Sequence, residues 1–132
     1  MTLNLLHRIR ADARAAGVVE FALVAPVLLS MVVGVVQLGR LYLANAGLAN
    51  AVEDAARFAT IWPRPTQTQI TTRISARQWG LESARLGAPS IAFTNSAPDY
   101  VTISMTYNFT LNYVLGEQTI ALTKSRRAFV TD

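Results

Sequence analysis

The chain contains one almost wholly apolar segment, and in most of the rest apolar and polar residues are interspersed. Residues 18–39 read VVEFALVAPVLLSMVVGVVQLG, in which Glu20 is the only formal charge. A helix needs about 20 such residues to cross the ~30 Å of hydrocarbon in a bilayer. We therefore expect residues 18–40 to form a transmembrane helix.

Helical spacing of apolar residues continues beyond this segment. One stripe of a helix would carry Leu41, Leu48, Val52, Ala55 and Ala59. Glu53 precedes Arg57 by four residues, an orientation that adds a few tenths of a kcal/mol to a helix. Pro63 and Pro65 then end the helical pattern. The sequence predicts one long helix over about residues 11–61.

A second, shorter helix is predicted over residues 66–86. Its apolar positions and one arginine recur at helical spacing: Ile70, Ile74, Arg77 and Leu81. Gly80 should weaken or break this helix. A short strand is then expected at residues 91–93, where apolar and polar residues alternate before a turn-forming run.

Strict alternation distinguishes residues 101–113. Every odd-numbered residue is apolar or aromatic, and every even-numbered residue is polar. This pattern predicts one strand, or two strands joined by a bend, with one face on a core and the other in water. Residues 116–117 should turn the chain into a partner strand around residues 119–123, which makes a hairpin.

The fold class that follows is α+β. A long N-terminal transmembrane helix continues into a small head, which contains a second helix and an antiparallel sheet of about three strands. Residues 1–17 form a basic leader, residues 18–40 cross the membrane, and residues 41–132 include the outer half of the long helix and the head. Neither a repeat nor a flexible linker separates these parts.

Charge gives the helix a direction. Arg8, Arg10 and Arg14 precede the apolar segment against Asp12 alone, so the positive-inside bias predicts a cytoplasmic N-terminus. Apolar residues make up 52% of the chain and charged residues 15%, which favours contact with a lipid bilayer. The net charge of +4 is dispersed, and we therefore expect no nucleic-acid partner.

A secretory signal peptide is the alternative interpretation of the N-terminal region. Residues 44–46 read ANA and offer a cleavage site of the small-x-small kind. The apolar run is longer than the usual 7–15 residues of a signal peptide, and Arg40 interrupts the approach to the site. A retained anchor is the favoured interpretation.

Candidate chemistry is sparse. The chain contains no cysteine, which excludes disulfides and thiolate sites, and its single histidine, His7, lies among arginines. The adjacent carboxylates Glu53 and Asp54 should point to different faces of a helix. No glycine-rich phosphate loop occurs. We therefore expect no catalytic residue, no metal and no cofactor, and we do not expect an enzyme.

Two residues inside the apolar segment depart from a plain membrane helix. Glu20 is costly in hydrocarbon, and an intramembrane carboxylate is a candidate functional residue. Its alternative role is that of an acid near the positive, N-terminal end of a helix at the membrane edge. Pro26 removes the backbone hydrogen bond to the carbonyl of Ala22 and should bend the helix.

The first sixty residues resemble the TadE-like family of the tight-adherence (Flp) pilus systems. The resemblance rests on the order of four elements: residues 19–23, which read VEFAL and include Phe21; Pro26; Gly39 with Arg40; and residues 55–57. It implies a pilin-like minor subunit or assembly component in the bacterial inner membrane, with its head in the periplasm. The implied partners are other pilus subunits and inner-membrane assembly proteins.

The resemblance also implies processing by a prepilin peptidase. Related proteins are cut after a glycine placed so that the glutamate becomes the fifth mature residue, where it is thought to pair with a neighbour's N-terminal amine. Here Ala15 occupies the position before the cut, Ala16 would start the mature chain, and Gly17 lies two residues too late. Cleavage after Ala15, irregular cleavage after Gly17 and retention of the whole chain all remain open.

Three roles are therefore open. The leading one is a structural or assembly subunit of a Tad-type pilus. The second is an uncleaved bitopic scaffold that presents a periplasmic domain to secretion or assembly partners. The third is a soluble binding domain released by cleavage after Ala46.

Overall fold

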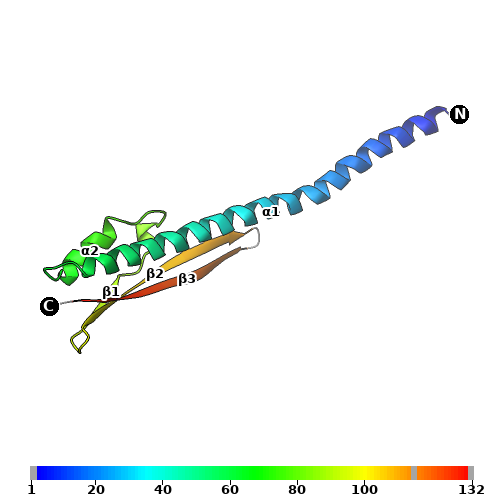
Figure 1. The fold of residues 1–132 in the computed structure, drawn as a ribbon. Helices are drawn as coiled ribbons and strands as arrows, with labels where there is room; N and C mark the ends of the chain where they lie inside the picture. The colour runs from blue at the N-terminus through cyan, green and yellow to red at the C-terminus, as the bar shows by residue number, and fades with distance from the viewer. Residues whose placement is uncertain (1–2, 114–115, 131–132) are drawn as a thin grey trace.

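One helix runs through nearly half of the protein. In the computed structural model, which describes residues 3–113 and 116–130 and the side chains from residue 16 onward, α1 spans Leu3–Ala59. Its 57 residues correspond to a length of about 85 Å. Figure 1 shows that the N-terminal part of α1 projects far beyond the rest of the molecule. The prediction of one long helix is confirmed, although the helix starts earlier than residue 11.

The C-terminal half of α1 supplies one side of the hydrophobic core. The buried residues of this half lie at helical spacing and are mostly alanines: Ala44, Leu48, Ala51, Val52, Ala55, Ala56 and Ala59. Small side chains let the helix lie close to the sheet. Four of the five residues of the predicted stripe are thus buried, and Leu41 packs against the core while half-buried.

A short helix, α2 at Gln67–Ser75, packs on the other side of α1. The Thr66 side chain accepts from the backbone N–H of Gln69, and the Gln69 side chain accepts from the backbone N–H of Thr66. This reciprocal pair is a capping box. Ile70 and Ile74 are fully buried in the core that α1 and the sheet share.

The prediction that this helix extends to residue 86 is wrong. α2 ends at Ser75, five residues before Gly80, because no residue between Ile74 and Leu81 reaches the core. Gly80 takes a left-handed backbone with φ of 73°, which turns the chain back toward α1. A 3₁₀ turn, η1 at Ser83–Arg85, follows.

Three antiparallel strands form the sheet in the order β1-β2-β3. They are β1 at Ser90–Thr94, β2 at Tyr100–Tyr113 and β3 at Gly116–Phe129. The alternating segment therefore forms a single continuous strand. Tyr113 pairs directly with Gly116, so residues 116–117 already belong to β3, and the prediction that they form the turn is wrong.

The inner face of the sheet rests on α1. Alternate residues of β2 are buried there, namely Val101, Ile103, Met105, Tyr107 and Phe109. The polar residues between them lie on the outer face of the sheet. Figure 1 shows β2 and β3 running along α1, with the end of β2 and the start of β3 directed toward the N-terminal part of the helix. The α+β class with a long apolar helix, a second helix and a three-stranded antiparallel sheet is thus confirmed.

Candidate functional site

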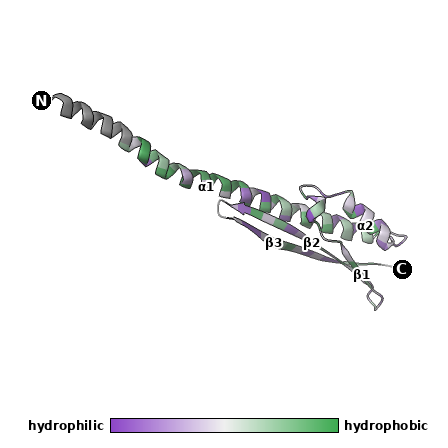
Figure 2. Ribbon diagram, turned by 180° about the vertical axis from the view of Figure 1, so that it is seen from behind, coloured by the Kyte–Doolittle hydropathy of each residue, from purple (hydrophilic) through white to green (hydrophobic). Residues whose placement is uncertain are grey.

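The N-terminal part of α1 exposes an apolar surface that the rest of the molecule does not cover. Its exposed residues, which we call the apolar face, are Val18, Val19, Phe21, Leu23, Val24, Val27, Leu28, Leu29, Met31, Val32, Val33, Val35, Val36 and Leu38. Figure 2 shows hydrophobic residues along this part of α1 before the head begins. Monomeric soluble proteins rarely expose contiguous apolar surface of this extent.

The apolar face is suited to a membrane. Among the described residues, one helix is long and apolar enough to cross a bilayer, and its most apolar window has no buried residue. A core helix of a soluble protein would be mostly buried instead. The structure therefore suggests a single-pass membrane protein.

Glu20 interrupts the apolar face. Its side chain is exposed, and within the described part of the chain no hydrogen bond or ion pair involves it. Phe21 beside it is 69% exposed. Both side chains are therefore available to a partner outside this molecule.

Pro26 lies inside α1 without ending it. Figure 1 shows the axis of α1 changing direction between its blue and cyan parts, as expected for a helix that contains a proline. Four residues later, the Ser30 hydroxyl donates to the carbonyl oxygen of Val27 at 2.7 Å. The helix thus bends in this region but continues toward the head.

The predicted processing positions lie on the same uninterrupted helix. Ala16 and Gly17 are exposed, and a Cβ added at Gly17 would meet nothing within 4 Å. The side chains of Ala15 and of the three topology arginines, Arg8, Arg10 and Arg14, lie outside the described part of the structure. Cleavage and orientation therefore stay predictions.

A groove lies where the β2–β3 hairpin ends against α1. It has a volume of about 440 Å³. Its walls come from α1 and from the end of β2: Ser30, Val33, Gly34, Gln37, Leu38, Leu111, Asn112 and Tyr113. The Gln37 side-chain N–H donates to the backbone carbonyl of Asn112 at 3.1 Å and ties the two elements together. The Gln37 Oε1 atom is buried and has no hydrogen-bond partner among the described residues.

Sequence reasoning missed this groove. It arises because β2 and β3 are long enough to reach the apolar part of α1, and the length of β3 has no clear signal in the sequence. Gly34 and Ser30 are the small residues that leave space there. Their spacing of four was the available indication, since small residues four apart often mark a close helix contact.

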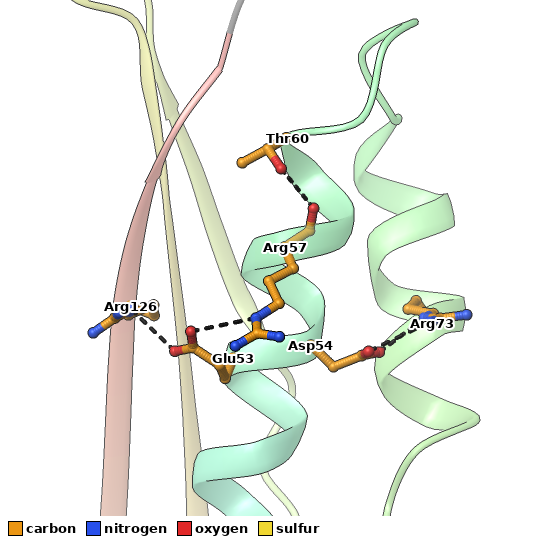
Figure 3. A network of polar contacts seen from close by, with 6 residues as sticks. All are labelled: Glu53, Asp54, Arg57, Thr60, Arg73 and Arg126. Atoms are coloured by element: carbon orange, nitrogen blue, oxygen red, sulfur yellow. Dashed lines mark hydrogen bonds and ion pairs between the residues drawn. The ribbon is translucent and has the colours of Figure 1, made fainter.

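Ion pairs hold the head together at the other end of α1 (Figure 3). Glu53 points toward β3, where its carboxylate lies 3.0 Å from Arg126 Nε, and it also lies 3.6 Å from Arg57 Nε on its own helix. Asp54 points toward α2, where Arg73 donates to both carboxylate oxygens at 2.8 and 3.3 Å. The prediction that these adjacent carboxylates point to different faces is confirmed.

Asp54 has the stronger pairing of the two carboxylates. The hydrogen bond from Arg73 and the positive charges of Arg73, Arg77 and Arg57 lower the pKa of Asp54, against the opposing effect of burial. A two-pronged arginine–carboxylate pair is favourable in geometry as well as charge. Asp54 thus fastens α2 to α1 and has a structural role.

The described residues contain no candidate metal site. No group of three or more metal-ligating side chains occurs among them. The adjacent carboxylates Glu53 and Asp54 are each engaged by arginines. The apolar face, Glu20 and the groove are the surfaces that the described residues leave open to lipid or to other chains.

Part of α1 matches a known family model. Residues 15–57 match the model described as TadE-like protein. The match covers about a third of the chain and includes the apolar face, Glu20, Pro26 and most of the helical side of the core. The searches of curated proteins and of solved structures return no match. The resemblance seen in the sequence is thus confirmed for the helix over residues 15–57.

Proposed function

We propose that this chain, whose long helix matches the TadE-like family model, is a pilin-like minor subunit or assembly component of a Tad-type pilus in the bacterial inner membrane. The apolar face supports this proposal most directly, because an exposed apolar helix needs either lipid or neighbouring helices around it. The protein would work through helix packing and protein contacts, without a reaction of its own.

The arrangement of the molecule suits either environment. α1 carries its uncovered part and its core-forming part on one continuous helix, so the head stays attached when the apolar part moves from lipid into a bundle of helices. Glu20 would then find a cation on a neighbouring chain, since no described residue of its own chain pairs with it. Cleavage after Ala15 would create such a cation, the new N-terminal amine.

Orientation follows from the leader. With Arg8, Arg10 and Arg14 held in the cytoplasm, the head lies in the periplasm. Release after Ala46 is the least compatible of the three roles, because that cut would fall inside α1 next to the buried Gly47 and would remove Ala44 from the core.

The second candidate function is an uncleaved bitopic scaffold. The exposed outer edge of β3, which pairs with no other strand among the described residues, supports this candidate because a partner strand can add to such an edge. A scaffold would keep the full-length chain and would stay in the membrane fraction.

One measurement separates these roles. The protein is expressed in its native host, and its N-terminus is determined by intact mass in the membrane fraction and in sheared surface filaments. A chain starting at Ala16 or Val18 in the filament fraction supports the pilus subunit. Full-length protein found only in membranes supports the scaffold, and a chain starting at Gly47 contradicts both.

A charge-neutral variant tests the part played by Glu20. Glu20→Gln keeps the size of the side chain but removes its charge, so it should reduce the amount of protein in filaments while leaving the membrane fraction unchanged. Glu117→Gln makes the same change at an exposed residue of the head and serves as the control. An equal loss in both variants would contradict a specific role for Glu20.

A further inference from the structure

The end of β2 and the start of β3, which we call the hairpin end, overlap the apolar part of α1 along the helix axis. Gln37 donates to the carbonyl of Asn112, and the groove beside this contact extends along the helix to Ser30. The strand residues Leu111 to Tyr113 therefore lie beside residues 30–38 of α1, inside the stretch predicted to cross the membrane as residues 18–40.

This overlap cannot continue into hydrocarbon. β3 is an edge strand whose outer backbone groups have no strand partner among the described residues, and lipid tails cannot satisfy them. Asn112 pairs with Glu117 at this end, and Glu117 is exposed. A carboxylate and open backbone groups require the headgroup layer or water.

We propose that the hairpin end rests on the outer leaflet of the bilayer, that the groove holds the glycerol-proximal part of a phospholipid acyl chain, and that the hydrocarbon ends near Gly34. This inference rests on the proposed membrane span. It identifies the occupant as lipid because the groove is continuous with the apolar face, which the same lipid layer surrounds.

The chemistry of the groove fits this position. On the side of the bilayer centre it is lined by Val33 and Gly34, and Gly34 leaves space because a Cβ there would meet nothing within 4 Å. About one helical turn closer to the head, the Gln37 side chain closes the groove by donating to the Asn112 carbonyl, and its Oε1 atom is buried. The lining is mostly apolar, with Val33, Leu38 and Leu111 beside the small residues Ser30 and Gly34, as suits an acyl chain.

Tyr113 becomes the interfacial aromatic residue in this arrangement. Its ring lines the groove while about half of the residue is exposed, as suits a side chain with one apolar and one wet end. Tyr42, eight residues beyond Gly34, would lie about 12 Å above the hydrocarbon.

If the hydrocarbon ends near Gly34, the depth of Glu20 in the membrane is also determined. About 20 residues ending at Gly34 begin at Ala15, which places Glu20 roughly 7 Å inside the hydrocarbon. A span ending at Gly39 would instead leave Glu20 at the membrane edge. The position of the hairpin end therefore places Glu20 within the hydrocarbon and not at the membrane edge.

Depth-dependent quenching of tryptophan fluorescence tests the arrangement in the full-length chain. Trp62 and Trp79 are 76% and 83% exposed, so both can be changed to Phe without disturbing the core. In that background, the Tyr113→Trp variant, called the hairpin reporter, carries its only tryptophan at the hairpin end. The Leu28→Trp variant, called the span reporter, carries its only tryptophan near the centre of the span.

Each reporter is reconstituted into phosphatidylethanolamine–phosphatidylglycerol vesicles that carry a nitroxide-labelled lipid. The label lies either near the glycerol, as the shallow label, or near the bilayer midplane, as the deep label. The hairpin reporter should lose most of its emission with the shallow label and little with the deep label. The span reporter should show the opposite preference.

Filling the groove gives a second readout. Gly34→Leu in the hairpin reporter should weaken quenching by the shallow label, because the added side chain takes the space of the acyl chain. Gly39→Leu is the matched control, because a Cβ at Gly39 also meets nothing within 4 Å and Gly39 does not line the groove. Equal quenching in the two variants would overturn the assignment of lipid to the groove.

Each other result has a definite meaning. Deep-label quenching of the span reporter, without any quenching of the hairpin reporter, overturns the inference and leaves the membrane span intact. If quenching of the hairpin reporter falls as the protein-to-lipid ratio rises, a second copy of the chain occupies the groove. This result also overturns the inference that lipid fills it. If the deep label does not quench the span reporter, the membrane span itself fails, and the inference fails with it.

Discussion

At Gly47, the addition of a single methyl group should lower the stability of the head. It lies buried on α1 where the segment after α2 crosses the helix, and a Cβ added there would collide with the backbone carbonyl oxygen of Trp79. The same Cβ would lie 3.5 Å from the side chain of Leu81. Because the obstructing atom belongs to the backbone, the crossing segment has to move as a whole.

The magnitude of Gly47→Ala follows from two opposing effects. Alanine favours a helix interior over glycine by about 1 kcal/mol. Overpacking of a tightly packed site costs about 1–3 kcal/mol, and a collision with backbone belongs at the upper end of that range. We expect a net loss of about 1–2 kcal/mol in the free energy of unfolding of the head.

Gly39→Ala is the matched control on the same helix. A Cβ at Gly39 meets nothing within 4 Å, so only the helix preference acts, and the variant should be as stable as the parent or more so by up to about 1 kcal/mol. The two variants make the same chemical change and should move stability in opposite directions.

Thermal unfolding of the full-length protein in detergent measures this difference. Near-ultraviolet circular dichroism follows the packing of the head while the apolar helix stays in the micelle. A change of about 1 kcal/mol shifts Tm by roughly 4–8 °C in a domain of this size. A Gly47→Ala protein with a Tm equal to or above that of Gly39→Ala would refute the close crossing at Gly47.

Three further predictions concern the head, and the same unfolding assay measures each of them. Leu48→Ala should cost about 2–5 kcal/mol, because Leu48 is fully buried between α1 and the sheet; a loss below about 1 kcal/mol would contradict its place in the core. Thr66→Ala removes the capping box of α2 and should cost about 1 kcal/mol, and an unchanged Tm would show that the cap contributes nothing. Asp54→Asn should cost on the order of 1 kcal/mol, because the ion pair with Arg73 is partly exposed to solvent. Since the pKa of Asp54 is lowered in the folded state, the pair stabilises the head above the unfolded pKa of about 3.9, and this stabilisation is lost as pH falls through the folded pKa. Asp54→Asn should therefore reduce the loss of Tm between about pH 5 and about pH 3, and an unchanged pH dependence would count against the pairing.

Hydrophobic spacing predicted the parts of the fold that bury a regular face. The stripe on α1 and the alternation in β2 each indicated the correct element because Leu48, Val52, Ile103 and Met105 all lie in one core. The family resemblance came from the same helix. Exposure of the apolar face also follows from sequence, since no other segment is apolar enough to cover it.

β3 could not be delimited in this way. Its inner face carries Lys124 and Arg126 where apolar residues would be expected, and this breaks the alternation. The strand continues because Arg126 meets Glu53 across the edge of the core, although the two residues lie far apart in the chain. An ion pair between distant segments leaves no periodic signal.

The groove and the end of α2 could not be predicted from the sequence for related reasons. The groove depends on how far the hairpin reaches along α1, which only the paired register of β2 and β3 determines. α2 ends at Ser75 because the chain next meets α1 through the Trp79 carbonyl and the Leu81 side chain, which both lie over Gly47. Both features are set by tertiary contacts, and spacing within a single segment does not encode them.

The continuity of α1 from Val18 to Ala59 fixes the rotational phase of the head relative to the apolar face. Successive residues of a helix advance by about 100° around the axis, and no loop between the two parts can absorb a change. One residue inserted between Gly39 and Ala44 would turn the head by about 100°, whereas four inserted residues would return it to within about 40° of its first direction. Neighbours that contact the apolar face therefore also determine the azimuth at which each head is displayed.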